Sequence, residues 1–312
     1  MSSPARYRIG VFHALFAAFL FGCGAPLSKP LLDRPDSDPL VLAGLLYLGA
    51  GLGLGLFLIL RRSPPSTPAA PPSPSLRGRE WLWFFFGSLC GGIAAPACLM
   101  WGLAHSTASE SSLLLSLESA FTALLAWIFF REAWNGRVLL GIVFVVAGAA
   151  ALSFQGGHGT SGFHLSLGCL AVALSTLGWG IDNNCTRKIA HCGAVRLAAW
   201  KGFLSGGLLL AVLLPLGHRL PPLPITLLAL LLGNISFGLC LAQMILSMQI
   251  LGAARMAAWF SVAPFFGALG AFLFLHDPVT SHFLAAAALT AVGLWLHATE
   301  GAGAHPSVDK QE

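Results

Sequence analysis

Ten apolar stretches, each long enough to cross a lipid bilayer, account for most of this 312-residue sequence. A spanning helix needs about 20 mostly apolar residues. Such residues fill the ranges 9–28, 39–60, 81–104, 110–130, 135–154, 163–185, 195–217, 223–247, 253–275 and 279–297. Only 9% of the residues are charged, whereas soluble globular domains carry about 25%. We therefore expect an all-α polytopic membrane protein with ten transmembrane helices, and the composition excludes a soluble domain or a nucleic-acid-binding protein.

Lysine and arginine are distributed unevenly, which predicts the orientation in the membrane because cytoplasmic loops are enriched in both. Of the 17 such residues, only Lys29, Arg34 and Arg219 lie on one side, and the remaining fourteen lie in the alternate loops and the termini. We expect a multi-pass protein of the inner (plasma) membrane with both termini cytoplasmic. A Pro-rich cytoplasmic loop at 61–80, typical of a semi-rigid spacer, and a cytoplasmic tail at 299–312 would lie outside the bilayer.

The two halves of the chain share a weak internal repeat. Phe21-Gly22 in the first span matches Trp179-Gly180 in the sixth, and Gly148 in the fifth matches Gly293 in the tenth. Because five spans is an odd number, the second repeat enters the membrane from the opposite side. The pattern predicts two inverted five-helix repeats, residues 9–154 and 163–298, an arrangement typical of secondary transporters that work by alternating access.

Two matching segments resemble a known family. Ser116–Glu132 in the first half and Ala263–Asp277 in the second, together with Gly178-Trp179-Gly180, are similar to the drug/metabolite transporter superfamily, EamA type. The resemblance covers about 9–298 and implies ten helices, a cavity lined by spans 1, 3, 4, 6, 8 and 9, and export of amino acids or other small metabolites. Family members often have proline beside the fourth-span segment, where this chain has Ser119 after Glu118, so no proline breaks the helix there.

Glu118 is the principal candidate for the substrate or proton site. An ionisable side chain inside a bilayer costs about 2.5–3.5 kcal/mol or more, so it usually has a function. Ser111, Glu118 and Thr122 share one helical face by their spacing, which predicts a stripe that faces a cavity. Glu118 could bind a substrate amine or carry a coupling proton. The alternative is a structural carboxylate hydrogen-bonded to a neighbouring helix.

The sixth span carries a second polar stripe of Ser175, Trp179, Asp182 and Thr186, with Asn183 beside it. Asp182 either pairs with a base at the cytoplasmic end of the helix or contributes to an inner gate at the floor of the cavity. Trp179 could stack on a substrate or simply pack.

Other spans supply weaker candidates. Gln243 in the eighth span is a candidate cavity residue, and His13 in the first is a candidate proton relay. Lys201 and Arg255 lie near the predicted cytoplasmic ends of spans 7 and 9, where we expect them to snorkel to the interface. The glycines between Gly49 and Gly55 favour close helix packing, with a homodimer seam as the alternative.

The sequence contains no pattern that indicates an enzyme, a cofactor or a metal site. Gly159-Thr160-Ser161-Gly162 matches an intramembrane serine protease motif, but it lies in a short polar loop and favours a turn. We expect a secondary transporter that exports a small polar metabolite such as an amino acid, with protons as the candidate coupling ion. The alternatives are an exporter of larger amino-acid-derived compounds (a metallophore) or drugs, and a membrane-embedded lipid-processing enzyme or scaffold.

Overall fold

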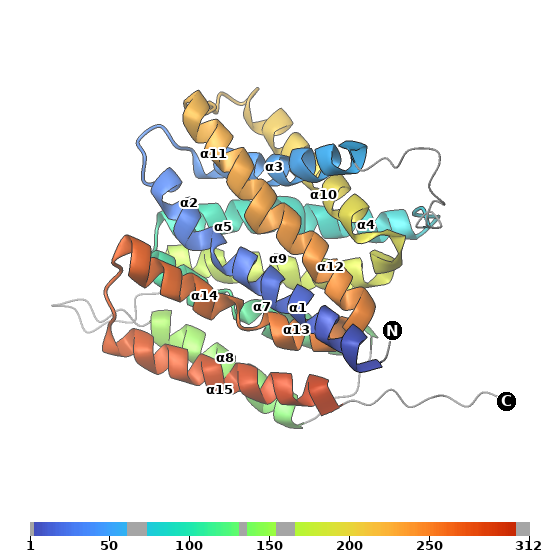
Figure 1. Cartoon of the computed structure of the whole chain (residues 1–312). Helices are drawn as coiled ribbons and strands as arrows, with labels where there is room; N and C mark the ends of the chain where they lie inside the picture. The colour runs from blue at the N-terminus through green and yellow to red at the C-terminus, as the bar shows by residue number, and fades with distance from the viewer. Residues whose placement is uncertain (1–2, 61–73, 131–135, 154–165, 304–312) are drawn as a thin grey trace.

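The computed structural model describes residues 3–60, 74–130, 136–153 and 166–303, and within these ranges all regular structure is helical (Figure 1). Most of the predicted Pro-rich loop, the Gly159–Gly162 segment and the end of the predicted tail lie outside the described residues.

The helices of the first half are α1 (Ser3–Gly22), α2 (Gly24–Leu32), α3 (Pro39–Leu60), α4 (Glu80–Gly87), the π-helical η1 (Ser88–Ala94), α5 (Ala95–Ala104), α6 (Ala108–Leu114), α7 (Leu117–Phe130) and α8 (Gly136–Ser153). Those of the second half are α9 (Leu167–Ile189), the 3-10 helix η2 (Ala190–Cys192), α10 (Ala194–Leu213), α11 (Leu223–Gly233), the π-helical η3 (Asn234–Leu239), α12 (Cys240–Leu251), α13 (Ala253–Phe260), α14 (Ala263–Gly270), the π-helical η4 (Ala271–Leu275) and α15 (Ser281–Gly303).

Seven helical stretches among the described residues are long and apolar enough to cross a membrane: Ala5–Leu32, Pro39–Leu60, Glu80–Ala104, Ala108–Phe129, Ala194–Leu213, Leu223–Leu251 and Arg255–Leu275. Gly136–Leu152 and Ser281–Leu296 are shorter apolar helices. The 23 residues of α9 are long enough to span, but the polar second half of this helix, which carries Asp182 and Asn183, lowers its hydropathy. The structure confirms an all-helical membrane protein, and the number of ten spans stays a prediction.

Helices that correspond in the two halves pack in corresponding pairs. α3 lies along α10, the second span against the seventh, and α8 lies along α15, the fifth against the tenth (Figure 1). α1 packs against α12 as α9 packs against α5, so the first span of each half contacts the third span of the other. This packing agrees with the two-repeat architecture inferred from the sequence.

The glycines that carried the sequence repeat occupy equivalent close contacts. A Cβ atom on Gly22 would lie 2.8 Å from the Cβ of Phe266 in α14, and one on Gly180 would lie 3.0 Å from the Cβ of Phe121 in α7. The first span of each half therefore approaches the fourth span of the other at a glycine. Gly51 likewise faces the backbone of Phe203 in α10, so this part of the predicted glycine stripe packs within the chain.

The fourth span is broken at Leu115-Ser116, although no proline is present. The helix is thus interrupted without the proline that family members often have there, and the break divides the predicted polar stripe. Ser111 belongs to α6 and contacts the Ser106 hydroxyl at 2.7 Å, whereas Glu118 lies in the first turn of α7. The Ser116 carbonyl accepts from the Ser119 hydroxyl at 2.9 Å and from the Ser119 backbone N–H at 3.3 Å, a local pattern by which serine competes with regular helical hydrogen bonds. The ninth span breaks between α13 and α14, where Pro264 begins the second segment.

Asp38 caps α3 on the side predicted to be external. Its Oδ1 accepts from the backbone N–H of Leu40 at 2.8 Å and of Val41 at 3.3 Å, and its other oxygen contacts the His218 ring. Burial raises the pKa of Asp38, but these hydrogen bonds outweigh burial and hold the pKa below its ordinary value. The carboxylate therefore links the loop after the first span to the loop after the seventh.

We expect Asp38→Ala to lower the free energy of unfolding by about 0.5–2 kcal/mol, the usual cost of losing an N-cap. Asp38→Asn keeps a capping oxygen but loses the charge. A depressed pKa stabilises the fold fully above the unfolded-state pKa of about 3.9. The native protein should therefore have a higher free energy of unfolding than Asp38→Asn at pH 7. That difference should vanish as the pH falls through the folded-state pKa. Thermal unfolding in detergent between pH 7 and about 3 measures both effects; a pH-independent difference would contradict the assignment.

Candidate functional site

A central cavity that is partly open lies between helices of both halves; the empty space within and in front of it amounts to about 540 Å³. Its lining residues are Phe21, Tyr47, Ala50, Glu118, Trp179, Asp182, Asn183, Ala198, Gly202, Phe237, Cys240, Leu241, Met244 and Phe260. The resemblance implied that the third span would line the cavity. Instead, the lining comes from α3 and α10, as well as from spans 1, 4, 6, 8 and 9. Tyr47 reaches in from α3, and small residues on α10 leave the cavity open to its backbone.

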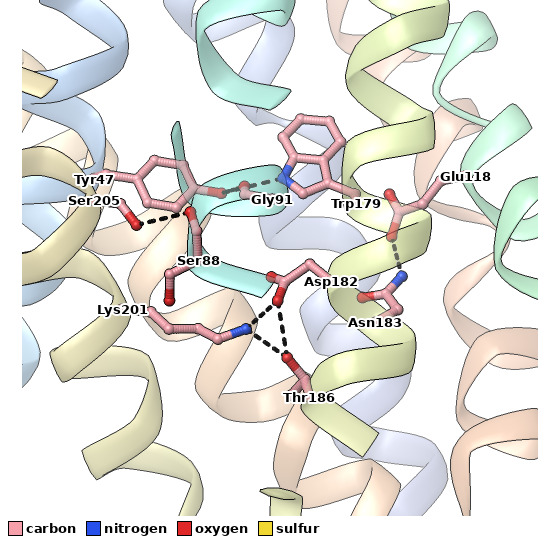
Figure 2. A network of polar contacts seen from close by, with 10 residues as sticks. All are labelled: Tyr47, Ser88, Gly91, Glu118, Trp179, Asp182, Asn183, Thr186, Lys201 and Ser205. Carbon is pink, nitrogen blue, oxygen red and sulfur yellow. Dashed lines mark hydrogen bonds and ion pairs between the residues drawn. The ribbon is translucent and has the colours of Figure 1, made fainter. Parts of the chain in front are cut away.

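Glu118 and Asn183 form the polar wall between α7 and α9 (Figure 2). The Asn183 amide donates to Glu118 Oε1 at 2.7 Å and to the Thr122 hydroxyl at 3.3 Å. Asn184 donates to the Thr122 carbonyl at 3.1 Å, which holds the two helices together below this contact. Glu118 is 8% exposed, so its carboxylate is nearly enclosed and has a single amide partner among the described side chains.

Asp182 forms a buried ion pair with Lys201 of α10. Lys201 also donates to the Thr186 hydroxyl, and Thr186 contacts Asp182 at 3.2 Å (Figure 2). Lys201 is only 2% exposed. The expectation that Lys201 would snorkel to the interface is therefore wrong, because this ion pair holds its ammonium inside the bundle. Asp182 therefore pairs with a base, but this base comes from α10 and not from the cytoplasmic end of α9.

The third span packs directly behind Asp182. A Cβ atom on Gly91 would lie 2.7 Å from Asp182 Oδ2, so only glycine lets this part of η1 approach the carboxylate. Since η1 is π-helical, it also releases a carbonyl from the usual helical pattern, and π-helical turns often lie at functional sites. The Tyr47 hydroxyl donates to the Gly91 carbonyl at 2.8 Å and accepts from the Trp179 indole at 3.1 Å. This one hydroxyl of α3 thereby joins η1 to α9.

Tyr47→Phe should lower the free energy of unfolding by about 1–3 kcal/mol, because it leaves the Trp179 N–H and the Gly91 carbonyl buried without partners. Thermal unfolding of the purified protein in detergent measures this loss. Tyr7→Phe is the matched control, since Tyr7 is exposed near the N-terminus. Equal stability of native protein and Tyr47→Phe would show that this hydroxyl does not join the helices.

The structure brings five of the predicted site residues to one region and leaves three elsewhere. Glu118, Trp179, Asp182 and Asn183 line the cavity, and Thr122 contacts Asn183. Ser175 is fully buried and donates to the Val172 carbonyl of its own helix at 2.7 Å. His13 contacts the Gln243 amide oxygen between α1 and α12, beside the cavity lining.

Two residues of this site were missed in the sequence. Lys201 is a charged residue within an apolar run, and this alone indicates a special role. Its position near a helix end nevertheless favoured a location at the membrane interface. Tyr47 lies in a glycine- and leucine-rich span, and no local pattern distinguishes its hydroxyl. Both act through long-range contacts that spacing along one helix does not reveal.

The arrangement can bind a positively charged or amine-bearing molecule. Glu118 supplies an acceptor for an ammonium group, and Asn183 supplies an amide that can donate and accept. Phe21, Phe237 and Phe260 form an aromatic wall, and ring faces attract cations. Asp182 pairs with Lys201. Glu118 is the other acidic side chain of the lining, and it has no cationic partner among the described residues.

Comparison with known proteins identifies relatives over most of the chain. The profile of the EamA-like transporter family matches residues 8–154 and 166–299. A protein named "Uncharacterized transporter" from Methanothermobacter thermautotrophicus is 26% identical over 281 residues, which cover 86% of this chain and 80% of that protein. A "Probable terminal-alkyne amino-acid exporter" from Streptantibioticus cattleyicolor is 35% identical over 74 residues, 23% of this chain and 25% of that protein. A solved crystal structure shares the fold, with a TM-score of 0.66, 18% identity, and coverage of 96% of this chain and 99% of that one.

Proposed function

The chain belongs to the EamA-like transporter family, and we propose that it is a secondary transporter that exports a small polar metabolite, such as an amino acid, by alternating access. The family and the names of the relatives indicate a transporter and not an enzyme. The observation that carries the proposal is a nearly enclosed acidic side chain, Glu118, in a cavity formed by helices of both halves.

The lining supports an amine-bearing substrate. An ammonium group next to Glu118 would replace water with a charge-assisted hydrogen bond, which is among the stronger polar contacts. Asn183 can orient a second polar group, and the surrounding phenylalanines fit an apolar side chain. A small amino acid combines these features, and one relative, matched over 23% of this chain, is named "Probable terminal-alkyne amino-acid exporter".

The packing supports a rocking motion of paired helices. Inverted repeats allow one half to move against the other so that a central site opens to each side in turn. The breaks after α6 and α13 lie at the fourth and ninth spans, where helix segments can change their relative angle with little loss of internal hydrogen bonds. Pro264 and Ser119 stand at corresponding points of these spans, which makes the two breaks candidate hinges.

Flux into proteoliposomes tests the proposal. Purified protein is reconstituted, and a panel of labelled amino acids and simple amines is supplied with and without a pH gradient. We expect saturable flux of one amine-bearing class, stimulated by the gradient and absent from protein-free vesicles. Flux confined to larger amino-acid-derived compounds or drugs would overturn the small-substrate part of the proposal. The absence of flux for every compound tried would contradict the transport function.

A further inference from the structure

Glu80, His191 and Cys192 form a cluster of metal-ligand side chains away from the central cavity. Glu80 begins α4, whereas His191 and Cys192 lie in η2 between α9 and α10. His191 Nε2 is 3.0 Å from Glu80 Oε1 and 3.5 Å from Cys192 Sγ, and Cys192 Sγ is 4.0 Å from Glu80 Oε2. One ligand atom of each residue lies within 4.8 Å of the other two.

These separations suit a tetrahedral zinc ion. Zinc binds sulfur at about 2.3 Å, imidazole nitrogen at about 2.0–2.1 Å and carboxylate oxygen at about 2.0–2.2 Å. A tetrahedron with such bonds places its ligand atoms roughly 3.3–3.7 Å apart. The cluster therefore needs only small side-chain rotations to enclose an ion, and its thiol, imidazole and carboxylate are all ligand types that zinc accepts.

We propose that Glu80, His191 and Cys192 bind one divalent metal ion of the zinc class, with the fourth position open to water. His191 is exposed and Glu80 is half-buried, so an ion has access from solvent, whereas Cys192 is buried. The site lies on the side of the membrane that the lysine and arginine distribution predicts to be cytoplasmic.

The surroundings of the cluster hold its ligands in place. Glu80 Oε2 accepts from the backbone N–H of Arg77 at 2.7 Å, which orients the carboxylate as outer-shell hydrogen bonds do in metal sites. Arg196 donates to the Cys192 carbonyl, and Gly193 ends η2 with a φ of 97°, a conformation that favours glycine. The turn that presents His191 and Cys192 is therefore fixed by its own backbone.

A bound ion would join three helices, α4, α9 and α10. It would tie the start of α4 to the turn between α9 and α10, the two helices that carry Asp182 and Lys201. The His191–Glu80 contact makes the same connection. The sequence alone did not suggest this site, because its ligands come from positions 80 and 191–192 and form no spaced motif.

Cobalt(II) provides the test, since a thiolate ligand gives its complex a characteristic charge-transfer absorption. Full-length protein is purified in detergent without a polyhistidine tag and titrated with Co²⁺, followed by Zn²⁺ as competitor. We expect one Co²⁺ per chain, displaced by Zn²⁺. The absorption should disappear in Cys192→Ser. His191→Ala and Glu80→Gln should weaken Co²⁺ binding by about tenfold or more, at least as much as the loss of an outer-shell partner costs in other metal sites.

Matched controls distinguish this site from the other cysteines and histidines. Cys98→Ser and His282→Ala change residues outside the cluster and should bind Co²⁺ as the native protein does. Thermal unfolding without metal checks that each variant is folded. The proposal is overturned if the native protein shows no thiolate absorption, if the absorption persists in Cys192→Ser, or if folded His191→Ala and Glu80→Gln bind as tightly as the native protein.

Discussion

Glu118→Gln should abolish the stimulation of transport by a pH gradient. We propose that Glu118 binds either a proton or the amine of the substrate. The two then exchange at one carboxylate as the protein alternates between its two orientations. Glutamine keeps the size of the side chain and a hydrogen bond to Asn183, but it can neither take up a proton near neutral pH nor pair with an ammonium. Losing a charge-assisted hydrogen bond of about 1.5–3 kcal/mol should weaken substrate binding by about 10- to 100-fold.

Proteoliposome flux with and without the gradient measures both effects. Glu110→Gln is the matched control, because Glu110 lies in a capping box at the start of α6 and outside the cavity lining. That variant should keep the response to the gradient. A folded Glu118→Gln protein with native affinity and native gradient dependence would show that this carboxylate is structural.

Lys201→Met should lower the free energy of unfolding strongly. It leaves Asp182 buried without its cation, and removing one partner of a buried ion pair costs about 3–5 kcal/mol. The ion pair itself contributes less than this, since both charges lost their hydration on burial. The double variant Asp182→Asn/Lys201→Met leaves no buried unpaired charge, so it should recover much of the free energy of unfolding that Lys201→Met loses.

A double-mutant cycle by thermal unfolding in detergent measures this coupling. Lys188→Met serves as the control. Lys188 is exposed and lies near the end of α9, the helix that carries Asp182, so its substitution should change stability little. If Lys201→Met is as stable as the native protein, or if the double variant is no more stable than Lys201→Met, the buried pair does not hold α9 to α10.

Features that depend on one helix at a time were predictable from the sequence. Apolar length indicated the helices, and the EamA resemblance is confirmed by the family match. Phe21-Gly22 and Trp179-Gly180 marked the repeat correctly because both glycines serve the same purpose, close approach of the first span to a fourth span. Glu118 and Asn183 stood out because polar residues are costly in a bilayer.

Features that depend on contacts between helices were not predictable in the same way. The positive-inside rule treated Lys201 as one of many topology signals, but the nearby Asp182 and Thr186 draw it into the bundle. The break at Leu115-Ser116 has no proline in the sequence to indicate it. Tyr47 joins Trp179 to Gly91 only because three spans converge there.

Accessibility of the cavity from both sides of the membrane tests alternating access most directly. Cys240 lines the cavity, so a variant that keeps only this cysteine reports, through membrane-impermeant thiol reagents, on the states in which the cavity opens. Ala198→Cys in a cysteine-free background is a second reporter, because Ala198 lines the cavity from α10. A variant that keeps only Cys169, which is buried away from the lining, is the control.

In sealed vesicles of defined orientation, we expect the cavity cysteine to be modified by reagent added to either side, whereas Cys169 stays unmodified. Transported substrate should slow the modification from both sides, because it occupies the same cavity. Modification of Cys240 and Ala198→Cys from one side only, whatever substrate is present, would contradict a cavity that opens alternately to the two sides of the membrane.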